Sequence, residues 1–541
     1  MWQIVLCVCL LLFGCRGQTN RPHIIVILAD DLGWNDVGFH GSNQIPTPNI
    51  DALAFSGIVL QNYYVTPVCT PSRSAFMTGK YPIHTGMQHA VIYGTQRKGL
   101  PLNEKILPQY LKDLGYKTHL VGKWHLGHYR REYLPTNRGF DTHIGHWTGK
   151  IDLFDHINLE RPGLLGFDFR KGFEPAYDLY GKYATDVYTE EAVKIIDAHK
   201  KTEPLFLMVA HSAVHSGNPF DPLRAPERDV ARFNITNEMR RKFAGVLSKM
   251  DESVGKVIDS LQKNGLLENS IVLFSTDNGG PAAGFNENAA SNYPLRGVKN
   301  SLWEGGVRGA GVLWSPLLER RSRVASQRAH IVDWLPTLYG AAGGNLSVFK
   351  NIDGIDQWEA LSKDGMSQRA SLVLNIDDIL GNAAITIDQW KVIKGDSNKG
   401  AWDSWYGPGG RSGHYNMEKL NSGLATRAIR SLGLMPTSDT VLRMREQATV
   451  KCDRNQSAIP CKPLVAPCLF NIESDPCEIR NLANQEPEIL MRMLGELESV
   501  NKTAVPPLAP AIVDEYGNPK YWGYLFLNFG DYENESPCVS E

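Results

Sequence analysis

A cysteine, a proline and an arginine stand close together in residues 69–79, which read CTPSRSAFMTG. Pro71 favours the first turn of a helix, because its ring fixes φ near the helical value and its missing N–H needs no partner there. Cys69 is then expected just outside the helix, at the positive end of its dipole, where free N–H groups favour an anion. Arg73 follows about one turn later and brings an oxyanion-binding guanidinium to the same point. The stretch predicts a nucleophile in an anion-binding site.

This stretch resembles the signature of the type I sulfatases, C-x-P-S-R-x-x-x-[LM]-T-G, and agrees with it at every fixed position. In that family the cysteine is oxidised during synthesis to formylglycine, an aldehyde that works as its hydrate. The alternative is that Cys69 is a small buried residue at the end of an ordinary helix, as most single cysteines are. The unbroken match from Pro71 to Gly79 favours the sulfatase interpretation.

Two pairs of oxygen-bearing residues follow strand-like segments. The near-continuous apolar run HIIVILA, typical of a strand buried on both faces, ends in Asp30 and Asp31. A second such run, SIVLFST, ends in Asp277 and Asn278. Open α/β sheets place their sites at the carboxyl ends of strands, so we expect these four side chains to meet. Their hard oxygens suit Ca²⁺ or Mg²⁺ better than zinc or copper. For each acid alone, a solvated turn or a helix cap is the alternative.

Basic residues follow two more strand-like runs. KTHLVG precedes Lys123 and His125, and PLFLMVA precedes His211 and His215. A lone histidine is more often structural than functional, and His125 within KWHLG is the stronger candidate of the three. All of these residues are expected at the same edge of one sheet as the acidic pairs.

The resemblance to sulfatases extends over nearly the whole chain after residue 17. The segments IIVILADDLGWND, CTPSRSAFMTG, GYKTHLVGKWHLG, GFDTHIG, FSTDNGG and PLRGVKNSLWEGGVRG follow one another in the order of the family. The branch that the chain resembles most is the arylsulfatase B-like branch, the N-acetylgalactosamine-4-sulfatases.

The resemblance implies a set of site residues. It implies one Ca²⁺ per chain and a sulfate-binding site next to it. His211 competes with His215, because the loop HSAVHSGNPF departs from the H-x-P-L of that branch. The implied metal ligands are Asp30, Asp31, Asp277, Asn278 and the modified Cys69, and the implied catalytic residues are Cys69, Arg73, Lys123, His125, His215 and Lys299.

The implied reaction is the hydrolysis of a sulfate ester. One hydroxyl of the formylglycine hydrate at position 69, activated by Ca²⁺ and an adjacent carboxylate, attacks sulfur. The arginine and the two lysines of the site stabilise charge on the sulfuryl oxygens. His215, with Lys299, protonates the departing alcohol. The second hydroxyl, deprotonated with help from His125, then expels sulfate.

Strands and helices alternate around these residues. This alternation predicts a large α/β domain with a mostly parallel sheet flanked by helices, and the resemblance implies an alkaline-phosphatase-like fold. Thr47 is expected to cap the first of the helices, with Pro48 at its first position. Helices are predicted at 47–55, 103–114, 184–200 and 237–264, and a further strand at 58–65, leading to Cys69.

The pattern changes at about residue 360. Glycine, serine and asparagine increase around 395–425, and the run 384–394 alternates in polarity like one strand of an antiparallel sheet. We therefore predict a signal peptide at 1–17, a catalytic domain at 18–360 and a smaller C-terminal α+β domain with an antiparallel sheet at 361–541.

Length and composition support this organisation. A chain of 541 residues with 42% hydrophobic residues has room for a large core and a second domain. With 56 basic and 58 acidic residues it presents no general polyanion-binding surface, and without a basic run or zinc-finger spacing it is not expected to bind nucleic acid. Residues 1–17 have the form of a secretory signal peptide, with a bacterial lipoprotein anchor at Cys15 as the alternative. No later apolar segment is long enough to cross a bilayer.

Cysteines and glycosylation sequons indicate the secretory pathway, ending in the lysosome or outside the cell. Cys7, Cys9 and Cys15 leave with the signal peptide. Of the late cysteines we expect Cys452 to pair with Cys461 and Cys468 with Cys477, leaving Cys538 free or intermolecular. Sequons stand at Asn234, Asn345, Asn455, Asn501 and Asn534.

Two other functions stay open at this point. A phosphatase or phosphodiesterase of the alkaline phosphatase superfamily would use zinc, but no two-zinc His/Asp pattern is present. A sulfated-glycan-binding protein would keep the fold without turnover if the formylglycine-generating enzyme did not act on it. The expected substrate is a sulfated sugar of the N-acetylgalactosamine 4-sulfate type or a small sulfated metabolite such as a glucosinolate. The pocket-rim segments 143–155 and 402–415 do not decide between these, and the oligomeric state is open.

Overall fold

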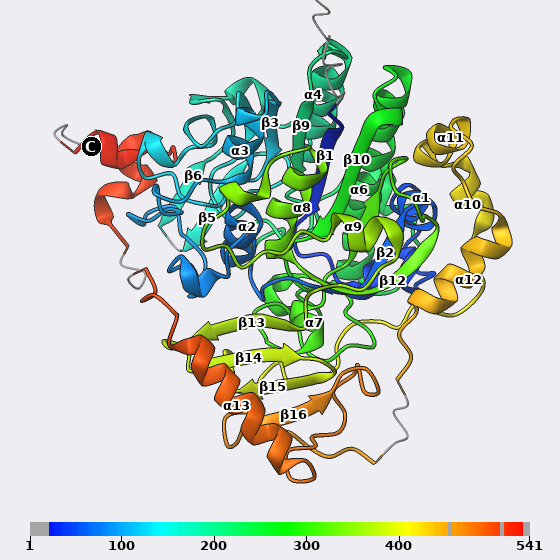
Figure 1. Cartoon of the computed structure of the whole chain (residues 1–541). Helices are drawn as coiled ribbons and strands as arrows, with labels where there is room; N and C mark the ends of the chain where they lie inside the picture. The colour runs from blue at the N-terminus through cyan, green and yellow to red at the C-terminus, as the bar shows by residue number, and fades with distance from the viewer. Residues whose placement is uncertain (1–20, 162, 453–456, 509–512, 534–541) are drawn as a thin grey trace, which may run out of the picture.

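A large mixed sheet forms the centre of the molecule (Figure 1). The computed structural model describes residues 21–161, 163–452, 457–508 and 513–533. Within them, ten strands form one sheet in the order β12-β2-β11-β10-β1-β9-β3-β4-β7-β8. Their bounds are β1 His23–Ala29, β2 Ile58–Tyr64, β3 Lys117–Gly122, β4 Thr142–Gly145, β7 Arg170–Lys171, β8 Glu174–Pro175, β9 Leu205–Ala210, β10 Ser270–Thr276, β11 Gly311–Trp314 and β12 Arg323–His330.

The middle of this sheet is parallel. β1 pairs in parallel with β10 on one side and β9 on the other, and β9 continues in parallel to β3 and β4. Ala29 lies opposite Thr276, and Ala210 lies opposite both Leu28 and Gly122. The strands β10, β1, β9 and β3 therefore end side by side. Antiparallel pairs occur at β11 and towards the edges.

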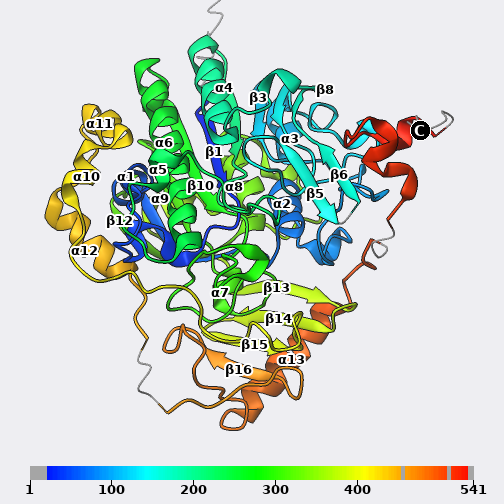
Figure 2. The same cartoon turned by 180° about the vertical axis from the view of Figure 1, so that it is seen from behind.

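Helices cover both faces of the sheet (Figures 1 and 2). In β1, Ile25 and Ile27 pack into the core with α4 and α6, whereas Val26 and Leu28 pack into the core with α2, α3 and α8. This two-sided burial explains the unbroken apolar run of the strand and confirms the predicted α/β architecture. The helices are α1 Pro48–Ser56, α2 Cys69–Thr78, α3 Leu107–Asp113, α4 Ala184–Ala198, α5 Glu227–Val230, α6 Glu238–Lys263, α7 Glu304–Val307, α8 Trp334–Ala341 and α9 Trp358–Lys363.

Two predicted helix starts differ in detail from the structure. α2 begins at Cys69 itself, after Val68 in extended conformation, so Cys69 lies in the first turn and not outside it. Pro71 is the third residue, where a missing N–H still costs no helical bond. Thr47 precedes α1 as expected, but its hydroxyl does not cap the helix, because it accepts from the Gly38 N–H and donates to Asp51.

The second sheet is small, antiparallel and separate from the first. Its order is β13-β14-β15-β16, and α13 (Pro487–Asn501) packs against β14 and β15. The run 384–394, predicted as one strand, is a hairpin instead. Asp388, with φ of 49°, turns the chain, as hairpin turns with left-handed residues do. The strands are β13 Ser371–Asp377, β14 Asn382–Ile387, β15 Trp390–Lys394 and β16 Cys468–Asn471.

Part of the chain after residue 394 returns to the large sheet. α11 (Leu424–Ser431) packs against α1 and α6, beside α10 (Met417–Ser422) and α12 (Ser438–Ala448). Near the C-terminus, Leu525 bridges to Phe167 in β6 (Leu164–Phe167), the partner of β5 (Ile157–Arg161). The division into domains at residue 360 stays a prediction, as does the signal peptide, which lies outside the described residues.

The disulfide prediction was wrong. Cys452 bonds Cys477, and Cys461 bonds Cys468. The chain folds back so that Ile459 exchanges backbone hydrogen bonds with the segment 479–481, which places one pair inside the other. The spacing of the cysteines along the chain favoured pairing between neighbours. It could not show that the chain folds back and brings Cys452 next to Cys477. Cys538 lies outside the described residues. Of the sequons, those at Asn234, Asn345 and Asn501 are exposed, and those at Asn455 and Asn534 are also outside the described residues.

A buried lysine joins the two sheets. Lys391 of β15 places its ammonium 2.9 Å from Glu304 of α7 and 2.8 Å from Glu478, and all three side chains are fully buried. Glu478 also accepts a hydrogen bond from the Glu304 backbone N–H, and Glu304 accepts one from the Tyr64 hydroxyl. At this junction one lysine is therefore shared by two carboxylates, and Glu304 also lies 3.6 Å from Arg308.

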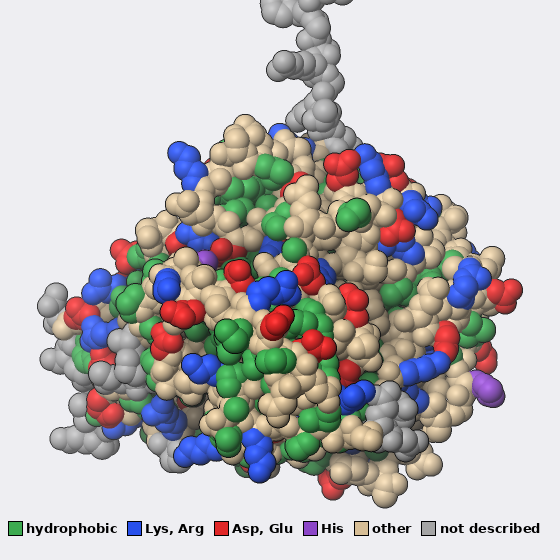
Figure 3. Space-filling model, turned by 60° about the horizontal axis from the view of Figure 1, so that its bottom comes forward, with side chains coloured by type: hydrophobic (Ala, Val, Ile, Leu, Met, Phe, Trp, Pro, Cys, Tyr) green, Lys and Arg blue, Asp and Glu red, His purple; other side chains and the backbone are tan. Residues whose placement is uncertain are grey.

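Charges of both signs cover the surface in Figure 3, interspersed with apolar side chains. This view agrees with the near-zero net charge. None of the helices in the described part of the chain is both long enough and apolar enough to span a membrane.

Asp251 of α6 should make stability depend on pH. Its buried carboxylate accepts hydrogen bonds from the Asn49 and Ile50 N–H groups at the start of α1. Burial raises the pKa of Asp251 from 3.8 to about 7. The folded state therefore keeps a proton that the unfolded state releases above about pH 4, so this group's contribution to the free energy of unfolding falls as pH rises from about 4 to 7, by at most about 4 kcal/mol.

Asp251→Asn should remove this dependence. We expect the difference in unfolding free energy between the original chain and the variant to be largest near pH 5 and to shrink towards pH 8, as measured by urea denaturation at both pH values. Glu252→Gln, a change at the neighbouring half-exposed carboxylate, is the control. A difference that stays constant with pH would show that Asp251 titrates normally.

Candidate active site

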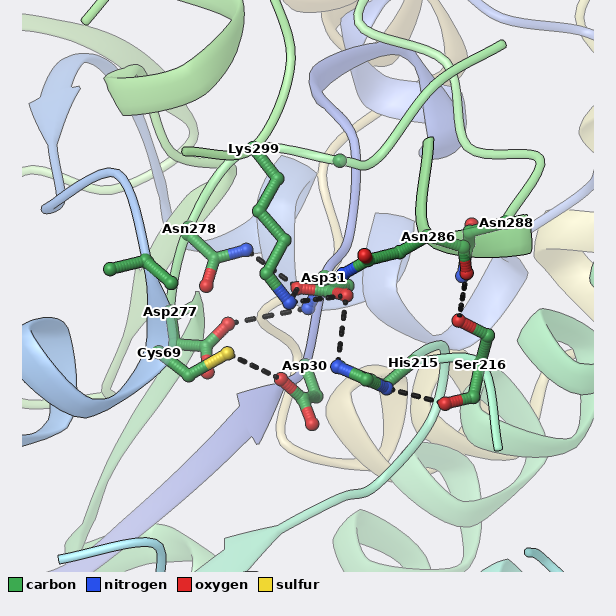
Figure 4. Close-up of polar contacts among 12 residues, drawn as sticks. Asp30, Asp31, Cys69, His215, Ser216, Asp277, Asn278, Asn286, Asn288 and Lys299 are labelled. Atoms are coloured by element: carbon green, nitrogen blue, oxygen red, sulfur yellow. Dashed lines mark hydrogen bonds and ion pairs between the residues drawn. The ribbon is translucent and has the colours of Figure 1, made fainter. Parts of the chain in front are cut away.

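The polar residues predicted at strand ends come together at one place. Asp30 and Asp31 follow β1, and Asp277 and Asn278 follow β10. Figure 4 shows these side chains converging with Cys69, His215 and Lys299. The structure brings together all the predicted site residues, namely Asp30, Asp31, Cys69, Arg73, Lys123, His125, His215, Asp277, Asn278 and Lys299, and it places His211 apart from the pocket.

Two cations hold the acids at the base of the site. Arg73 contacts Asp277 through Nε at 3.0 Å and Nη2 at 2.8 Å, and its Nη2 lies 3.6 Å from Asp30. Lys123 Nζ lies 2.6 Å from the other oxygen of Asp30. The Arg73 guanidinium also donates to the Lys123 carbonyl at 3.2 Å, which ties α2 to the end of β3.

Asp31 is the centre of a second group. Lys299 Nζ lies 2.7 Å from its carboxylate, the Asn278 amide donates to it at 2.7 Å, and His215 Nε2 lies 3.4 Å away. Burial alone would raise the pKa of Asp31, but Lys299 and His215 outweigh it and hold that pKa below its usual range. Asp31 is therefore ionised, in a left-handed backbone conformation with φ of 64°.

The donor set fits a hard divalent cation. One oxygen each from Asp30, Asp31 and Asp277 and the sulfur of Cys69 all lie within 4.8 Å of one another. The Asn278 side-chain oxygen is buried and has no hydrogen-bond partner among the described residues. Burial and the neighbouring Asp30 raise the pKa of Asp277, although Arg73, Lys123 and Lys299 act in the opposite direction. An ion with oxygen ligands would satisfy all of these groups.

The Cys69 thiol is neutral in this site. It is 1% exposed, and its Sγ lies 3.6 Å from Asp30 Oδ1. Burial raises the pKa of Cys69 to about 12, although Lys123 and Lys299 act in the opposite direction. The start of α2 does not suffice to ionise it. A neutral thiol is a poor nucleophile.

His125 offers a hydrogen-bond acceptor to the pocket. Its Nε2 contacts the Ile92 carbonyl at 3.0 Å, and since a carbonyl only accepts, this nitrogen carries the proton. Nδ1 is buried without a partner among the described residues. Burial, with Lys123 and Arg73 nearby, lowers the pKa of His125 well below its ordinary value, so the ring is a neutral base.

His215 and not His211 lines the pocket. His215 contacts Asp31 through Nε2, while its Nδ1 lies 2.6 Å from the Ser216 carbonyl (Figure 4). His211 is fully buried near Tyr188, and burial lowers its pKa to about 4. Sequence alone could not separate them, because both follow β9 within five residues.

A pocket of about 580 Å³ opens over the site. Cys69, His125, His215 and Lys299 line it. The sequence reasoning missed further polar lining residues, among them Lys150, Glu160, Asn286 and Glu287. For Lys150 a signal existed, since it lies in the rim segment 143–155. The other rim segment, 402–415, instead contributes Gly407, Pro408 and His414 to a larger neighbouring groove.

The chain is similar to known sulfatases in sequence and in fold. The family described as Sulfatase matches residues 22–344. "Arylsulfatase J" of Mus musculus is 41% identical, over 96% of this chain and 82% of that protein. "N-acetylgalactosamine-6-sulfatase" of Canis lupus familiaris is 30% identical, over 72% of this chain and 75% of that protein.

Among solved structures, a similar one is described as "Crystal structure of Ps i-CgsB in complex with k-i-k-neocarrahexaose". Its TM-score is 0.68 at 27% identity, covering 92% of this chain and 97% of that one. The similarity thus extends beyond the large sheet to the C-terminal part of the chain.

Proposed function

The chain belongs to the sulfatase family and is a sulfuric ester hydrolase, and we propose that it hydrolyses sulfated sugars with a formylglycine made from Cys69 and a bound Ca²⁺. One observation supports this most directly. Three carboxylates, an unpartnered amide oxygen and Cys69 converge within reach of Arg73, Lys123 and Lys299.

The proposed metal ligands are Asp30, Asp31, Asp277, Asn278 and the side chain at position 69. A bound Ca²⁺ supplies positive charge that polarises a sulfate oxygen and the group at position 69. Oxidation of Cys69 supplies a hydrated aldehyde, whose hydroxyl is the nucleophile that the neutral thiol is not. The carboxylates Asp30, Asp31 and Asp277 balance the cations Arg73, Lys123 and Lys299 one for one, so that a divalent ion leaves the site positive and ready for an anion.

The remaining residues bind the sulfate and move protons. Lys123 and Lys299 border the position where sulfate oxygens gain charge, and Arg73 holds Asp277 in place beside them. His215 and Lys299 lie together at the pocket wall, where the departing alcohol takes its proton. Burial lowers the pKa of His215 and its Nδ1–H donates to the Ser216 carbonyl, so this proton comes from the Lys299 ammonium beside it. His125 takes a proton at its free Nδ1. Each positioned acid or base contributes about 10²–10⁴-fold to the rate.

The proposed substrate is a sulfated sugar, and the arylsulfatase B-like branch remains our assignment within the family. The names of two similar proteins, an N-acetylgalactosamine-6-sulfatase and one solved with a carrahexaose, favour a sugar over a small metabolite such as a glucosinolate. The paired cysteines and the exposed sequons support passage through the secretory pathway, with the lysosome or the outside of the cell as destination.

Removal of the metal tests this proposal. Protein from a secretory host should hydrolyse a chromogenic aryl sulfate, and a calcium chelator should lower the rate by about 100-fold or more, because three buried carboxylates would lose their shared cation. Added Ca²⁺ should restore the rate and raise the melting temperature. Asp277→Asn should abolish both the recovery and the thermal shift.

Asp229→Asn, at a buried carboxylate remote from the site, is the control and should keep both responses. An enzyme whose activity and melting temperature ignore chelator and calcium would contradict the metal assignment. A protein that binds sulfated glycans without hydrolysing any ester would instead be the binding protein of the same fold.

A further inference from the structure

We propose that Asn234 carries an N-linked glycan, which occupies the large groove beside the active-site pocket and keeps long substrates out of it. The groove has a volume of about 1260 Å³, and we call it the Asn234 groove. The modification itself is independent of the reaction, whereas its effect on the choice of substrate rests on the proposed function. Residues of four segments line the groove, namely 43–46, 232–240, 283–290 and 407–419.

Residues 234–236 have the form that N-glycosylation requires. They read Asn-Ile-Thr in the segment between α5 and α6, and both Asn234 and Thr236 are exposed. A glycan at this position therefore displaces no part of the core. The disulfides and the proposed passage through the secretory pathway bring the chain into the compartment where this modification is made.

The position of Asn234 directs a glycan into the groove. Asn234 itself lines the groove, so the first sugars attached to it start inside. Half-buried Phe233, Ile235 and Met239 give the lining an apolar part, and polar side chains from other segments offer partners to sugar hydroxyls. This combination is typical of ligand sites. The polar lining residues include Asn43, Asn237, His414, Asn416 and Lys419.

Hydrogen bonds between the four segments hold the groove open. Arg240, buried near the start of α6, donates to the Gln44 side chain and to the Ala289 carbonyl, each at 2.9 Å. It thereby joins three of the segments. The Asn43 amide donates to the Ser412 carbonyl at 3.2 Å, which fixes the fourth. A preformed hollow of this kind accepts a ligand without the cost of ordering its walls.

The chain's own glycan has an advantage over a free sugar that enters the groove. Its attachment to Asn234 makes the contact intramolecular, with an effective concentration on the order of millimolar for a short flexible connection. A free saccharide that binds the same surface weakly has to compete with this concentration. The attached glycan is therefore the occupant that we expect.

The Asn234 groove and the active-site pocket share a wall. Gly284 and Glu287 line both of them. The Ser216 hydroxyl donates to the Asn286 carbonyl at 2.6 Å, which holds this wall against the loop after β9 (Figure 4). One path for a long sugar chain with its sulfate at position 69 leads across this wall into the groove. The glycan closes that path, whereas a short substrate does not need it.

Mass spectrometry of protein from a secretory host tests the modification. The peptide that contains Asn234 should carry a glycan, and its enzymatic release in heavy-oxygen water should leave a labelled aspartate. Thr236→Ser should keep the glycan and Thr236→Ala should lose it, because the sequon needs a hydroxyl. Backbone hydrogen exchange in 283–290 and 407–419 should become faster by about twofold or more once the glycan is removed, while exchange in α13 stays the same.

Two substrates of different length test the effect on activity. One is a sulfated N-acetylgalactosamine–uronate disaccharide, offered as the 4-sulfate and as the 6-sulfate, and the other is a polymer of the same repeat. The ratio of kcat/KM for the polymer to that for the disaccharide should rise by about 10-fold or more in Asn234→Gln, mostly through KM.

Trimming of the glycan to its first sugar on the folded enzyme should raise the ratio in the same way, which covers the case that Asn234→Gln folds poorly. Asn501→Gln removes the sequon at the end of α13 and is the control. It should leave the ratio as it is.

The outcomes separate the two proposals. An unmodified Asn234 in a host that glycosylates Asn501 overturns the inference, and so does a glycan whose removal changes neither the hydrogen exchange nor the ratio. Faster exchange with an unchanged ratio overturns the effect on substrates. The sulfatase proposal survives all three results. An enzyme that carries formylglycine but cleaves no sulfate ester overturns that proposal, and mass spectrometry with hydrogen exchange still decides whether the glycan fills the groove.

Discussion

Replacement of Cys69 by alanine should abolish sulfate ester hydrolysis, with a loss in kcat of about 10⁴-fold or more, while the protein stays folded. The loss is expected to be this large because the proposed nucleophile derives from this one side chain. The cost to stability should be small, on the order of 1 kcal/mol, since only one sulfur atom is removed from a buried position. Rates on an aryl sulfate and a thermal unfolding curve measure both effects.

The same experiment needs a control on the same helix. Ser74→Ala removes a buried hydroxyl of α2 that bonds the Pro71 carbonyl, and it lies outside the pocket. It should lower the melting temperature about as much as Cys69→Ala and keep the activity. Mass spectrometry of the peptide that contains residue 69 completes the test, because the active protein should carry formylglycine there. Full activity with an unmodified cysteine, or in the alanine variant, would end the proposal.

Loss of Lys391 should destabilise the protein by about 3–5 kcal/mol, the largest effect on stability that we expect from one substitution away from the active site. Lys391→Met keeps the length of the side chain and removes the charge between Glu304 and Glu478. Glu478 then loses its ion-pair partner in a fully buried place, and Glu304 keeps Arg308 at 3.6 Å. Burial already raises the pKa of Glu478 to about 7, with Lys391 opposing the shift, so without Lys391 the Glu478 carboxyl should hold its proton to a higher pH.

This predicts a pH dependence that a simple packing defect would not have. The destabilisation by Lys391→Met, measured by urea denaturation, should be smaller at pH 5 than at pH 8, since protonated acids need no counter-ion. The double variant Lys391→Met, Glu478→Gln should recover part of the unfolding free energy that Lys391→Met loses. Lys394→Met, at an exposed lysine of the same strand, should have almost no effect. Equal losses at both pH values would argue against an electrostatic role.

The sequence predicted that most residues of the candidate site would lie together, because each signal was local. A strand buried on both faces appears as a continuous apolar run, and its carboxyl end is fixed by the polar residues that follow. Asp30, Lys123 and Asp277 could therefore be placed at one sheet edge from the parallel order alone. The family signature added Cys69 and Arg73, which no periodicity would have singled out.

Features that depend on how distant segments meet could not be predicted in this way. The pairing of Cys452 with Cys477 follows from a return of the chain at 459 and 479–481. The hairpin at Asp388 was hidden because two short antiparallel strands joined by two residues alternate like one longer strand. The state of the Cys69 thiol depended on burial from several elements, which outweighs the local effect of the helix start.

The burial of α2 bears on when the proposed oxidation of Cys69 can take place. Every residue from Cys69 to Thr78 is buried in the folded protein, and apolar residues of α2 pack in one core with those of α3 and α8. An enzyme that oxidises Cys69 must hold this segment in its own active site, which is impossible once the helix is covered. Under the proposed oxidation of Cys69, modification and folding would compete, and a molecule that folds first would stay inactive. The specific activity of a preparation would then report the fraction of molecules in which Cys69 was oxidised before folding.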